Sequence, residues 1–174
     1  VDARYGDVLK SSAEWQSLKA EWASLKGRVE SMPAEEALLA QRAFIGKLLK
    51  FRDSVAMESG LSLDADPTTY ATIGIAVNAV PNIVNQLGIF RNLSTTAALG
   101  GSMAEGDRVI AVWNRDAAVS SMGEIEFYMK WIRDAHPEFE KKLAPLVSKA
   151  KSDVMSYSQF VESNVWNAEK ITVD

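Results

Sequence analysis

The chain has 174 residues, of which 47% are hydrophobic and 24% are charged. This length and balance suit a folded, water-soluble domain and argue against a disordered or membrane-embedded chain. A net charge of −4 supplies no basic field for phosphate backbones, so the composition disfavours a nucleic-acid partner. The absence of cysteine excludes disulfides, thiol nucleophiles and zinc–thiolate sites together.

The two ends of the chain suggest a segment of a longer protein. There is no run of about 18 consecutive apolar residues that would span a bilayer, and the first residues lack the layout of a signal peptide. The chain begins without Met inside an apparently helical pattern and stops without a terminating signal. We therefore expect membrane anchors beyond both ends.

Residues 8 to 29 carry apolar side chains at alternating steps of three and four, which predicts a helix with a heptad seam. The seam consists of Val8, Trp15, Leu18, Trp22, Leu25 and Val29. Charged residues, Lys19 among them, lie largely off this seam, as expected for a solvated helix face. Pro33 disfavours the helical conformation of the residue before it, so we predict a break or kink near residues 31 to 33.

The second and third helices are predicted from a wide apolar face and from a capping signal. Residues 34 to 58 form the second helix. Asp66 caps free amides and Pro67 suits the first helical position, so the third helix should begin near residue 66. It continues to about residue 99, with a bend between Asn78 and Pro81, because Pro81 removes a backbone hydrogen bond. Its apolar set is Ile73, Ala76, Val77, Val80, Ile83, Val84, Leu87 and Phe90.

Two further helices complete the pattern. Gly100 and Gly101 should end the third helix, and Ser102 with Glu105 predicts a capping box for the fourth, which runs to about residue 134. Its expected seam is Ile110, Trp113, Ala117, Ser120, Ser121, Glu124, Tyr128 and Trp131. A turn at His136 leads to the last helix, whose seam is Phe139, Leu143, Val147, Ala150, Val154, Tyr157 and Val161.

About five helical segments with short connections predict an all-α fold. The expected architecture is an elongated, up-and-down antiparallel bundle of the four-helix type, with residues 1 to 174 as one domain. The heptads of the first and last helices suit either the internal core or a homodimer seam.

Catalysis and metal binding find little support in the sequence. His136 is the only histidine and lies in a predicted turn, where a solvated side chain is the expected state. No Glu-x-x-His pair, which metal sites in bundles typically use, occurs in the chain. No glycine-rich phosphate loop follows a strand. We expect no catalytic residue, no metal and no cofactor.

Polar groups at apolar seam positions are where a bundle would bind a small molecule. Arg42 and Arg52 lie close to the apolar face of the second helix, and Arg91 falls on the apolar line of the third. A carboxylate held between them would be bidentate with guanidinium, which favours an acid or another anion as ligand. Alternatively, these arginines extend into solvent or pair with internal acids such as Asp53 and Glu124.

Other polar and aromatic residues allow two interpretations. Asn78 either contacts a ligand or satisfies backbone carbonyls freed by the bend. Asp64, Asp66 and Tyr70 are expected to organise the corner between the second and third helices rather than to bind anything. The tryptophans are expected to be core or dimer-seam aromatics rather than a ligand box.

Residues 59 to 93 read SGLSLDADPTTYATIGIAVNAVPNIVNQLGIFRNL. They resemble a pattern of the periplasmic regions of proteobacterial methyl-accepting chemotaxis receptors and membrane sensor histidine kinases, which read SGLxLDPDxxSYYLM, then an LP step and an LGxxR step. The matches are Ser59, Gly60, Leu61, Leu63, Asp64, Asp66, Tyr70, Pro81, Leu87, Gly88 and Arg91. The chain departs from the pattern at Ala65, Ala71 and Val80.

The likeness covers roughly residues 10 to 99, since the preceding WQSLKAEWASL stretch is also similar to such receptors. It implies a periplasmic helical-bundle sensor domain, flanked by transmembrane helices and followed by a kinase or chemotaxis output module. Such a domain detects a small molecule or a partner and transmits a helix displacement across the membrane. The alternative is a structural or scaffolding bundle that binds a partner protein through an exposed heptad seam.

Overall fold

The computed structural model describes residues 2 to 100 and 102 to 166, and in these ranges the chain is all-α without a strand. The predicted fold class, an all-α helical bundle, is confirmed. Contacts within the chain divide it into two compact units, unit 1 (Val1–Ala65) and unit 2 (Asp66–Asp174). That residues 1 to 174 form a single domain stays a prediction.

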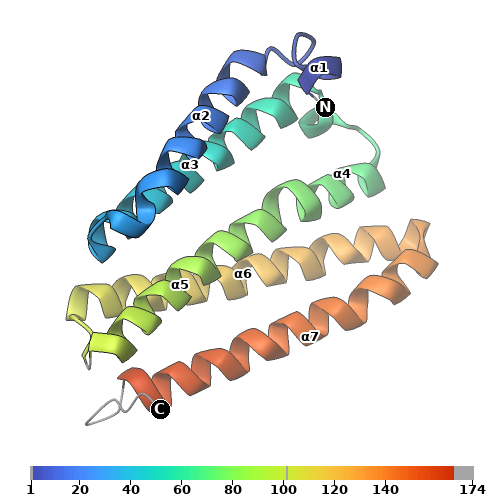
Figure 1. Cartoon of the computed structure of the whole chain (residues 1–174). Helices are drawn as coiled ribbons and strands as arrows, with labels where there is room; N and C mark the ends of the chain where they lie inside the picture. Colours follow the sequence, from blue (N-terminus) through green and yellow to red (C-terminus); the bar gives the residue numbers. More distant parts are fainter. Residues whose placement is uncertain (1, 101, 167–174) are drawn as a thin grey trace. The chain divides into compact units, whose positions relative to one another are not determined.

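Unit 1 is a hairpin of two long helices, α2 (Ser12–Arg28) and α3 (Ala34–Glu58), which run antiparallel (Figure 1). A short α1 (Asp2–Tyr5) precedes the hairpin. The 3-10 turn η1 (Val29–Ser31) and an extended Pro33 join the two long helices. The predicted break near residues 31 to 33 is therefore confirmed, as is the second helix over residues 34 to 58.

The core of unit 1 is small and rich in aromatic rings. Leu18, Leu25 and Phe44 are buried between α2 and α3. Partly buried side chains surround them: Trp15, Val29, Met32, Ala40, Leu48 and Phe51. Val8 is not part of this seam, because it lies in the turn before α2 and is 74% exposed. Most of the predicted seam of the first helix thus contributes to a core.

A glycine and a short 3-10 turn end unit 1. Gly60 has a φ of 73°, which side chains with a Cβ rarely adopt, and this residue turns the chain out of α3. The turn η2 (Leu61–Leu63) follows and leads to Asp64, whose backbone is extended. These residues belong to the segment that resembles the receptor pattern.

Unit 2 consists of three long helical stretches, each of which runs antiparallel to the one before it (Figure 1). The first stretch is continuous from Pro67 to Gly100. The elements are α4 (Pro67–Ile73), η3 (Gly74–Ala79), α5 (Val80–Gly100), α6 (Glu105–Ala135), α7 (Pro137–Val161) and η4 (Glu162–Trp166).

Of the two helix caps predicted in unit 2, one is confirmed and the other is wrong. The Asp66 carboxylate accepts a hydrogen bond of 2.7 Å from the Thr69 backbone N–H, with Pro67 in the first turn, so the predicted cap is confirmed. The predicted capping box at Ser102 is wrong. The N-cap of α6 is Ala104, which makes no side-chain cap bond. Gly101 lies outside the described residues.

A π-helical segment, η3, precedes Pro81 where the sequence predicts a bend. The Val80 N–H donates to the carbonyl of Ile75, five residues earlier, so this turn holds one residue more than an α-helical turn. A proline lacks an N–H donor, and its ring clashes with the carbonyl four residues before it. The wider turn relieves that clash, and the helix continues to Gly100.

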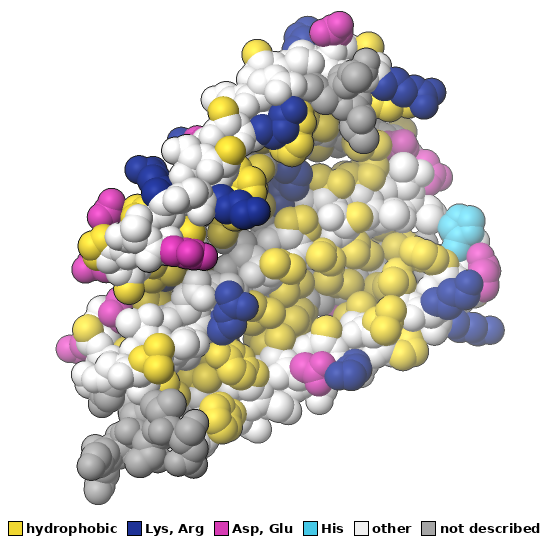
Figure 2. Space-filling model, in the orientation of Figure 1, with side chains coloured by type: hydrophobic (Ala, Val, Ile, Leu, Met, Phe, Trp, Pro, Cys, Tyr) yellow, Lys and Arg dark blue, Asp and Glu magenta, His cyan; other side chains and the backbone are white. Residues whose placement is uncertain are grey.

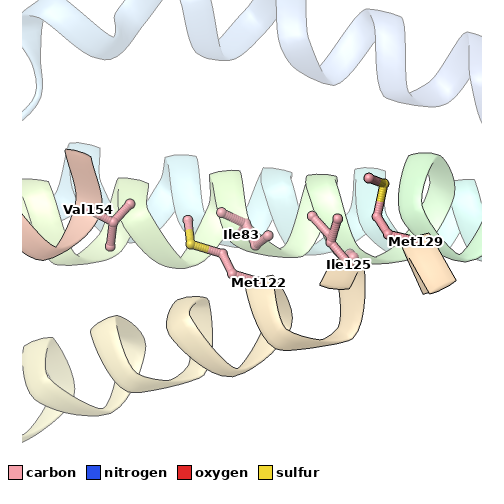
Figure 3. Packing of buried hydrophobic residues seen from close by; sticks show 6 residues of the cluster. Ile83, Met122, Ile125, Met129 and Val154 are labelled. Atoms are coloured by element: carbon pink, nitrogen blue, oxygen red, sulfur yellow. The ribbon is translucent and has the colours of Figure 1, made fainter. Parts of the chain in front are cut away.

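The core of unit 2 contains two apolar clusters. The central cluster joins α5, α6 and α7 through Ile83, Met122, Ile125, Met129 and Val154, which Figure 3 shows. The second cluster lies toward the C-terminal end of α5 and comprises Phe90, Leu93, Ala111 and Val161. The predicted seam of the last helix contributes to both clusters through several of its members.

The predicted seam of α6 is wrong by about one residue. The buried positions are Ala111, Asn114, Ala118, Ser121, Met122, Ile125, Met129 and Ile132. By contrast, Trp113 is 67% exposed and Ile110 and Trp131 are also exposed. One residue corresponds to a rotation of about 100° on a helix. The largest side chains suggested one face, whereas small Ala111 and Ala118 allow closer packing of α6 on the other.

The stretch from Pro67 to Gly100 is long and apolar enough to cross a membrane, judged by length and composition only. A core helix of a soluble bundle satisfies the same criterion. Its α5 segment packs against α6 in both apolar clusters, as a core helix does.

Candidate functional site

A cavity of about 360 Å³, open to solvent on one side, lies between α2 and α3 of unit 1. Its volume lies within the range of small-molecule sites, about 300–1,000 Å³. The lining is formed by Trp15, Leu18, Lys19, Trp22, Gln41, Phe44, Ile45 and Leu48. Six of these eight side chains are apolar, so the cavity suits an apolar ligand body with few polar groups.

Two stacked aromatic pairs flank this cavity. The rings of Trp22 and Phe44 have centroids 5.3 Å apart and planes inclined by 24°. Trp15 stacks on Phe51 at 5.7 Å and 18°. Steps of three and four residues place Trp15, Leu18 and Trp22 on one side of α2, so each Trp meets a Phe from α3. Trp22 is stacked on Phe44 and is nevertheless 49% exposed, and it lines the cavity.

Lys19 and Gln41 are the polar groups of the lining. The Lys19 Nζ lies 5.8 Å from the centroid of the Trp15 ring, within the range of a cation–π contact. In the described part of the chain no carboxylate forms an ion pair with Lys19. Nearby, Lys47 pairs with Glu21 at 2.7 Å, so those two charges compensate each other. Lys19 is therefore an uncompensated positive charge at the cavity.

The cavity lining differs from the side-chain sets that catalytic and metal sites use. None of its lining side chains is a nucleophile adjacent to a general base. Within residues 2–100 and 102–166, no three His, Asp or Glu side chains gather in a way that would hold a metal ion. His136 is not one of the lining residues. It is exposed directly before α7, and its Nδ1 lies 3.7 Å from a Glu138 carboxylate oxygen.

The predicted arginines differ in their surroundings. Arg42 and Arg52 lie on α3 in unit 1, and Arg91 lies on α5 in unit 2. Arg52 donates to the Asp53 carboxylate at 2.7 Å, which is one of the alternatives expected from the sequence. Arg91 is exposed and donates to the Asn92 side chain at 3.3 Å. An anion shared by these arginines stays a prediction.

Arg42 differs from the other two predicted arginines in the burial of its guanidinium group. Its Nε and one Nη atom are buried, and neither has a hydrogen-bond partner among the described residues. A buried donor without a partner costs about 1–3 kcal/mol. Arg42 does not line the α2–α3 cavity, although it directly follows Gln41. It therefore stays a separate candidate for contact with an anion.

The remaining predicted residues lie at the start of unit 2 or just before it. The Tyr70 ring contacts the rings of Tyr128 and Trp131, at centroid distances of 6.1 and 6.4 Å, and so helps α4 pack against α6. Asp66 caps α4, and the backbone hydrogen bond from Thr69 lowers the pKa of its carboxyl group. Asp64 and Asn78 are exposed.

Gly74 is a packing residue that the sequence did not indicate. A Cβ atom at this position would lie 2.6 Å from Cζ of Tyr128, so the lack of a side chain at Gly74 leaves room for the Tyr128 ring of α6. Burial of the Tyr128 side chain raises the pKa of its hydroxyl group. The π-helical segment thus begins at the point where α4 and α6 come into close contact.

Sequence reasoning also missed Lys19 and Gln41. Lys19 was assigned to the solvated face because it lies off the seam of α2. A signal was nevertheless available, because Lys19 follows Trp15 by four residues and precedes Trp22 by three. A lysine at that spacing lies beside both rings on a helix. Gln41 carried no such signal, since its role depends on how α3 packs against α2.

A second groove lies along the start of α6 in unit 2, with a volume of about 680 Å³. It is lined by Met103, Glu105, Arg108, Val109, Val112, Trp113 and Asp116. A single helix and the turn before it form this groove, and its charges have both signs. It defines no ligand class as clearly as the α2–α3 cavity does.

Comparison with protein-family models, with curated proteins and with solved structures finds no match to this chain. The fold and the cavity therefore define its class by themselves: an all-α helical bundle with a mostly apolar cavity.

Proposed function

We propose that this chain is the extracytoplasmic input domain of a bacterial transmembrane signalling receptor, either a sensor histidine kinase or a chemoreceptor. In this proposal the domain lies in the periplasm, between transmembrane helices, and works as a homodimer. It binds a small molecule and carries out no reaction itself. The resemblance of residues 59 to 93 to such receptors supports the receptor class.

The observation that carries the proposal is the cavity between α2 and α3. Its volume of about 360 Å³, its mostly apolar lining and its single uncompensated cation fit the recognition of a small ligand. The core around the cavity includes three buried hydrophobic side chains. A small core leaves the two helices free to adjust, which a sensor requires.

Signalling by this geometry needs only a small displacement. A ligand between α2 and α3 would favour one relative position of these helices over others, because it contacts both. Packed helices typically respond by sliding past one another. In the proposed receptor, this shift reaches the membrane through the helices that continue beyond the chain.

A thermal-shift screen against a collection of small metabolites tests this proposal. We expect at least one compound to raise the melting temperature in a saturable manner, because ligands that bind only the folded state stabilise it. Trp22→Ala and the milder Ile45→Gln, both in the cavity lining, should abolish that shift. Trp113→Ala, at an exposed position on α6, is the matched control and should retain it.

Two results would contradict the proposal. One is a screen in which no compound stabilises the chain. The other is stabilisation that both cavity variants retain in full, since the ligand would then bind elsewhere. The receptor class is tested separately by the complete gene product, which should carry apolar spans on both sides and a kinase or signalling module.

A second candidate function has one observation in its favour. The helix α6 exposes large apolar side chains near both of its ends: Val109, Ile110, Trp113, Phe127 and Trp131. Apolar positions at helical spacing suit a partner helix, so the chain would then be a scaffolding bundle. This function predicts a stable complex that Trp113→Glu disrupts, together with no response to any small molecule.

A further inference from the structure

We infer that the cavity between α2 and α3 binds a small aromatic monocarboxylate, with Lys19 as the partner of the carboxylate. This inference rests on the proposed function and names the ligand class of the proposed sensor. It depends on three features of the cavity: its aromatic walls, the position of its cation and the scarcity of other polar groups.

The aromatic walls favour a planar ligand. Trp15 and Trp22 both line the cavity, and each is already stacked on a phenylalanine of α3 with nearly parallel ring planes. The exposed ring surface of Trp22 can therefore take a further ring in the same orientation. Aromatic pairs gain stabilisation beyond the apolar area that they bury. A planar ring thus gains more here than a flexible aliphatic chain of similar size.

The cation determines the polar end of the ligand. Lys19 Nζ lies over the Trp15 ring, 5.8 Å from the ring centroid. On α2, the positions three and four residues away from Lys19 are Trp15, Gln16, Trp22 and Ala23, none of them acidic. The residues of α3 that line the cavity are also uncharged. A ligand carboxylate would therefore be the counter-ion that Lys19 lacks.

The remaining lining limits the ligand to one charged group. Lys47, a cation of the facing helix, is paired with Glu21 through hydrogen bonds of 2.7 and 2.8 Å. A second carboxylate on the ligand would find no unpaired cation in the lining. Sugars and other ligands with many hydroxyl groups need several polar partners, and apart from Lys19 the lining offers only Gln41. One carboxylate and an apolar ring match this set.

Titration of the chain with phenylacetate, phenylacetamide and hexanoate tests the inference. Phenylacetamide has nearly the same shape as phenylacetate without the charge, and hexanoate has the charge without the ring. We expect saturable binding of phenylacetate with a Kd below about 1 mM and at least about tenfold weaker binding of the other two. Among the indole N–H signals of the five tryptophans, those of Trp15 and Trp22 should shift, and that of Trp113 should not.

Lys19→Met isolates the contribution of the charge. It should weaken phenylacetate binding by about tenfold and leave phenylacetamide binding unchanged. Lys26→Met, an exposed lysine two turns further along α2, is the matched control and should leave both unchanged. Since Lys19 is exposed, the variant is expected to keep the fold, which circular dichroism checks.

The outcomes separate this inference from the proposed function. If phenylacetate binds without dependence on Lys19, or without shifting the Trp15 and Trp22 signals, the inference is wrong. It is also wrong if phenylacetate does not bind but another metabolite stabilises the chain through the cavity, and the proposed function then stands. If no compound binds the cavity at all, both are wrong.

Discussion

Units 1 and 2 bury their apolar side chains to different extents. In unit 1, two helices enclose a core around Leu18, Leu25 and Phe44, and Trp22 remains 49% exposed. In unit 2, three helical stretches surround two apolar clusters, and Phe90 and Ile132 are fully buried. On the face seen in Figure 2, hydrophobic side chains gather over unit 2, and Lys and Arg side chains lie over both units.

This difference indicates a division of roles. Three packed helical stretches can cover both faces of a core, whereas a two-helix hairpin leaves one side open. The open side of unit 1 contains the aromatic cavity, and unit 2 contains the close contact between Gly74 and the Tyr128 ring. We expect most of the conformational stability in unit 2 and most of the ligand response in unit 1.

The largest effect is expected from Phe90→Ala in unit 2. Phe90 is fully buried against Tyr157 and Trp166, so removal of its ring leaves a cavity. The free energy of unfolding should fall by about 3–5 kcal/mol, measured by chemical denaturation. Val84→Ala, at a 66% exposed position of the same helix, should change it by less than about 0.5 kcal/mol. Hydrogen exchange should rise in α5 to α7 but not in α2 and α3; a rise throughout the chain would show that the units unfold together.

Gly74→Ala tests the close approach of α4 and α6. The added methyl group would lie 2.6 Å from the Tyr128 ring, so the free energy of unfolding should fall by about 1–3 kcal/mol. Gly88→Ala, where a Cβ has open space, should instead raise it by up to about 1 kcal/mol. In a double-mutant cycle with Tyr128→Ala, most of the Gly74→Ala effect should disappear. If it persists, the ring is not the cause.

Arg42→Met is expected to stabilise unit 1. The substitution keeps much of the side-chain volume and removes buried donors that have no partner among the described residues. The free energy of unfolding should rise by about 1 kcal/mol. Arg28→Met, at an exposed position, is the control and should have almost no effect. A clear loss of stability in Arg42→Met would mean that the guanidinium is bound by a partner after all.

The smallest effect concerns the Asp66 cap at the start of unit 2. The backbone hydrogen bond from Thr69 lowers the pKa of Asp66 in the folded chain below its unfolded value. Ionised Asp66 therefore stabilises the fold above the unfolded pKa, and this contribution is lost as the pH falls through the folded pKa. Asp66→Ala should lower the melting temperature at pH 7, and the difference from the unmodified chain should shrink as the pH falls from about 5 to about 2. A difference that is constant over this range would contradict an electrostatic origin.

Local signals in the sequence predicted the elements of the fold well. The cap at Asp66, the break at Pro33 and the second helix over residues 34 to 58 were all correct, because each depends on a few neighbouring residues. The capping box at Ser102 failed although its spacing was right. Such a box competes with the alternative start at Ala104, and packing of α6 decides between them.

The candidate site was predicted less well. Lys19 is exposed, as its position off the seam predicts, but the cavity beside it was not predicted. The seam of α6 was placed on its aromatic side, because size and hydrophobicity alone do not determine which face of a helix is covered. Arg52 illustrates the same limit, since its pairing with Asp53 was one of several arrangements that the sequence allowed.

The sequence by itself determined the all-α class, the main helices and the turns between them, because helix periodicity and capping act over a few residues. Only the tertiary structure decided which face of each helix is buried, that Gly74 admits the Tyr128 ring, and that Lys19 lies beside an aromatic cavity. These properties depend on the surface of the neighbouring helix, and residues far apart in the chain supply that surface.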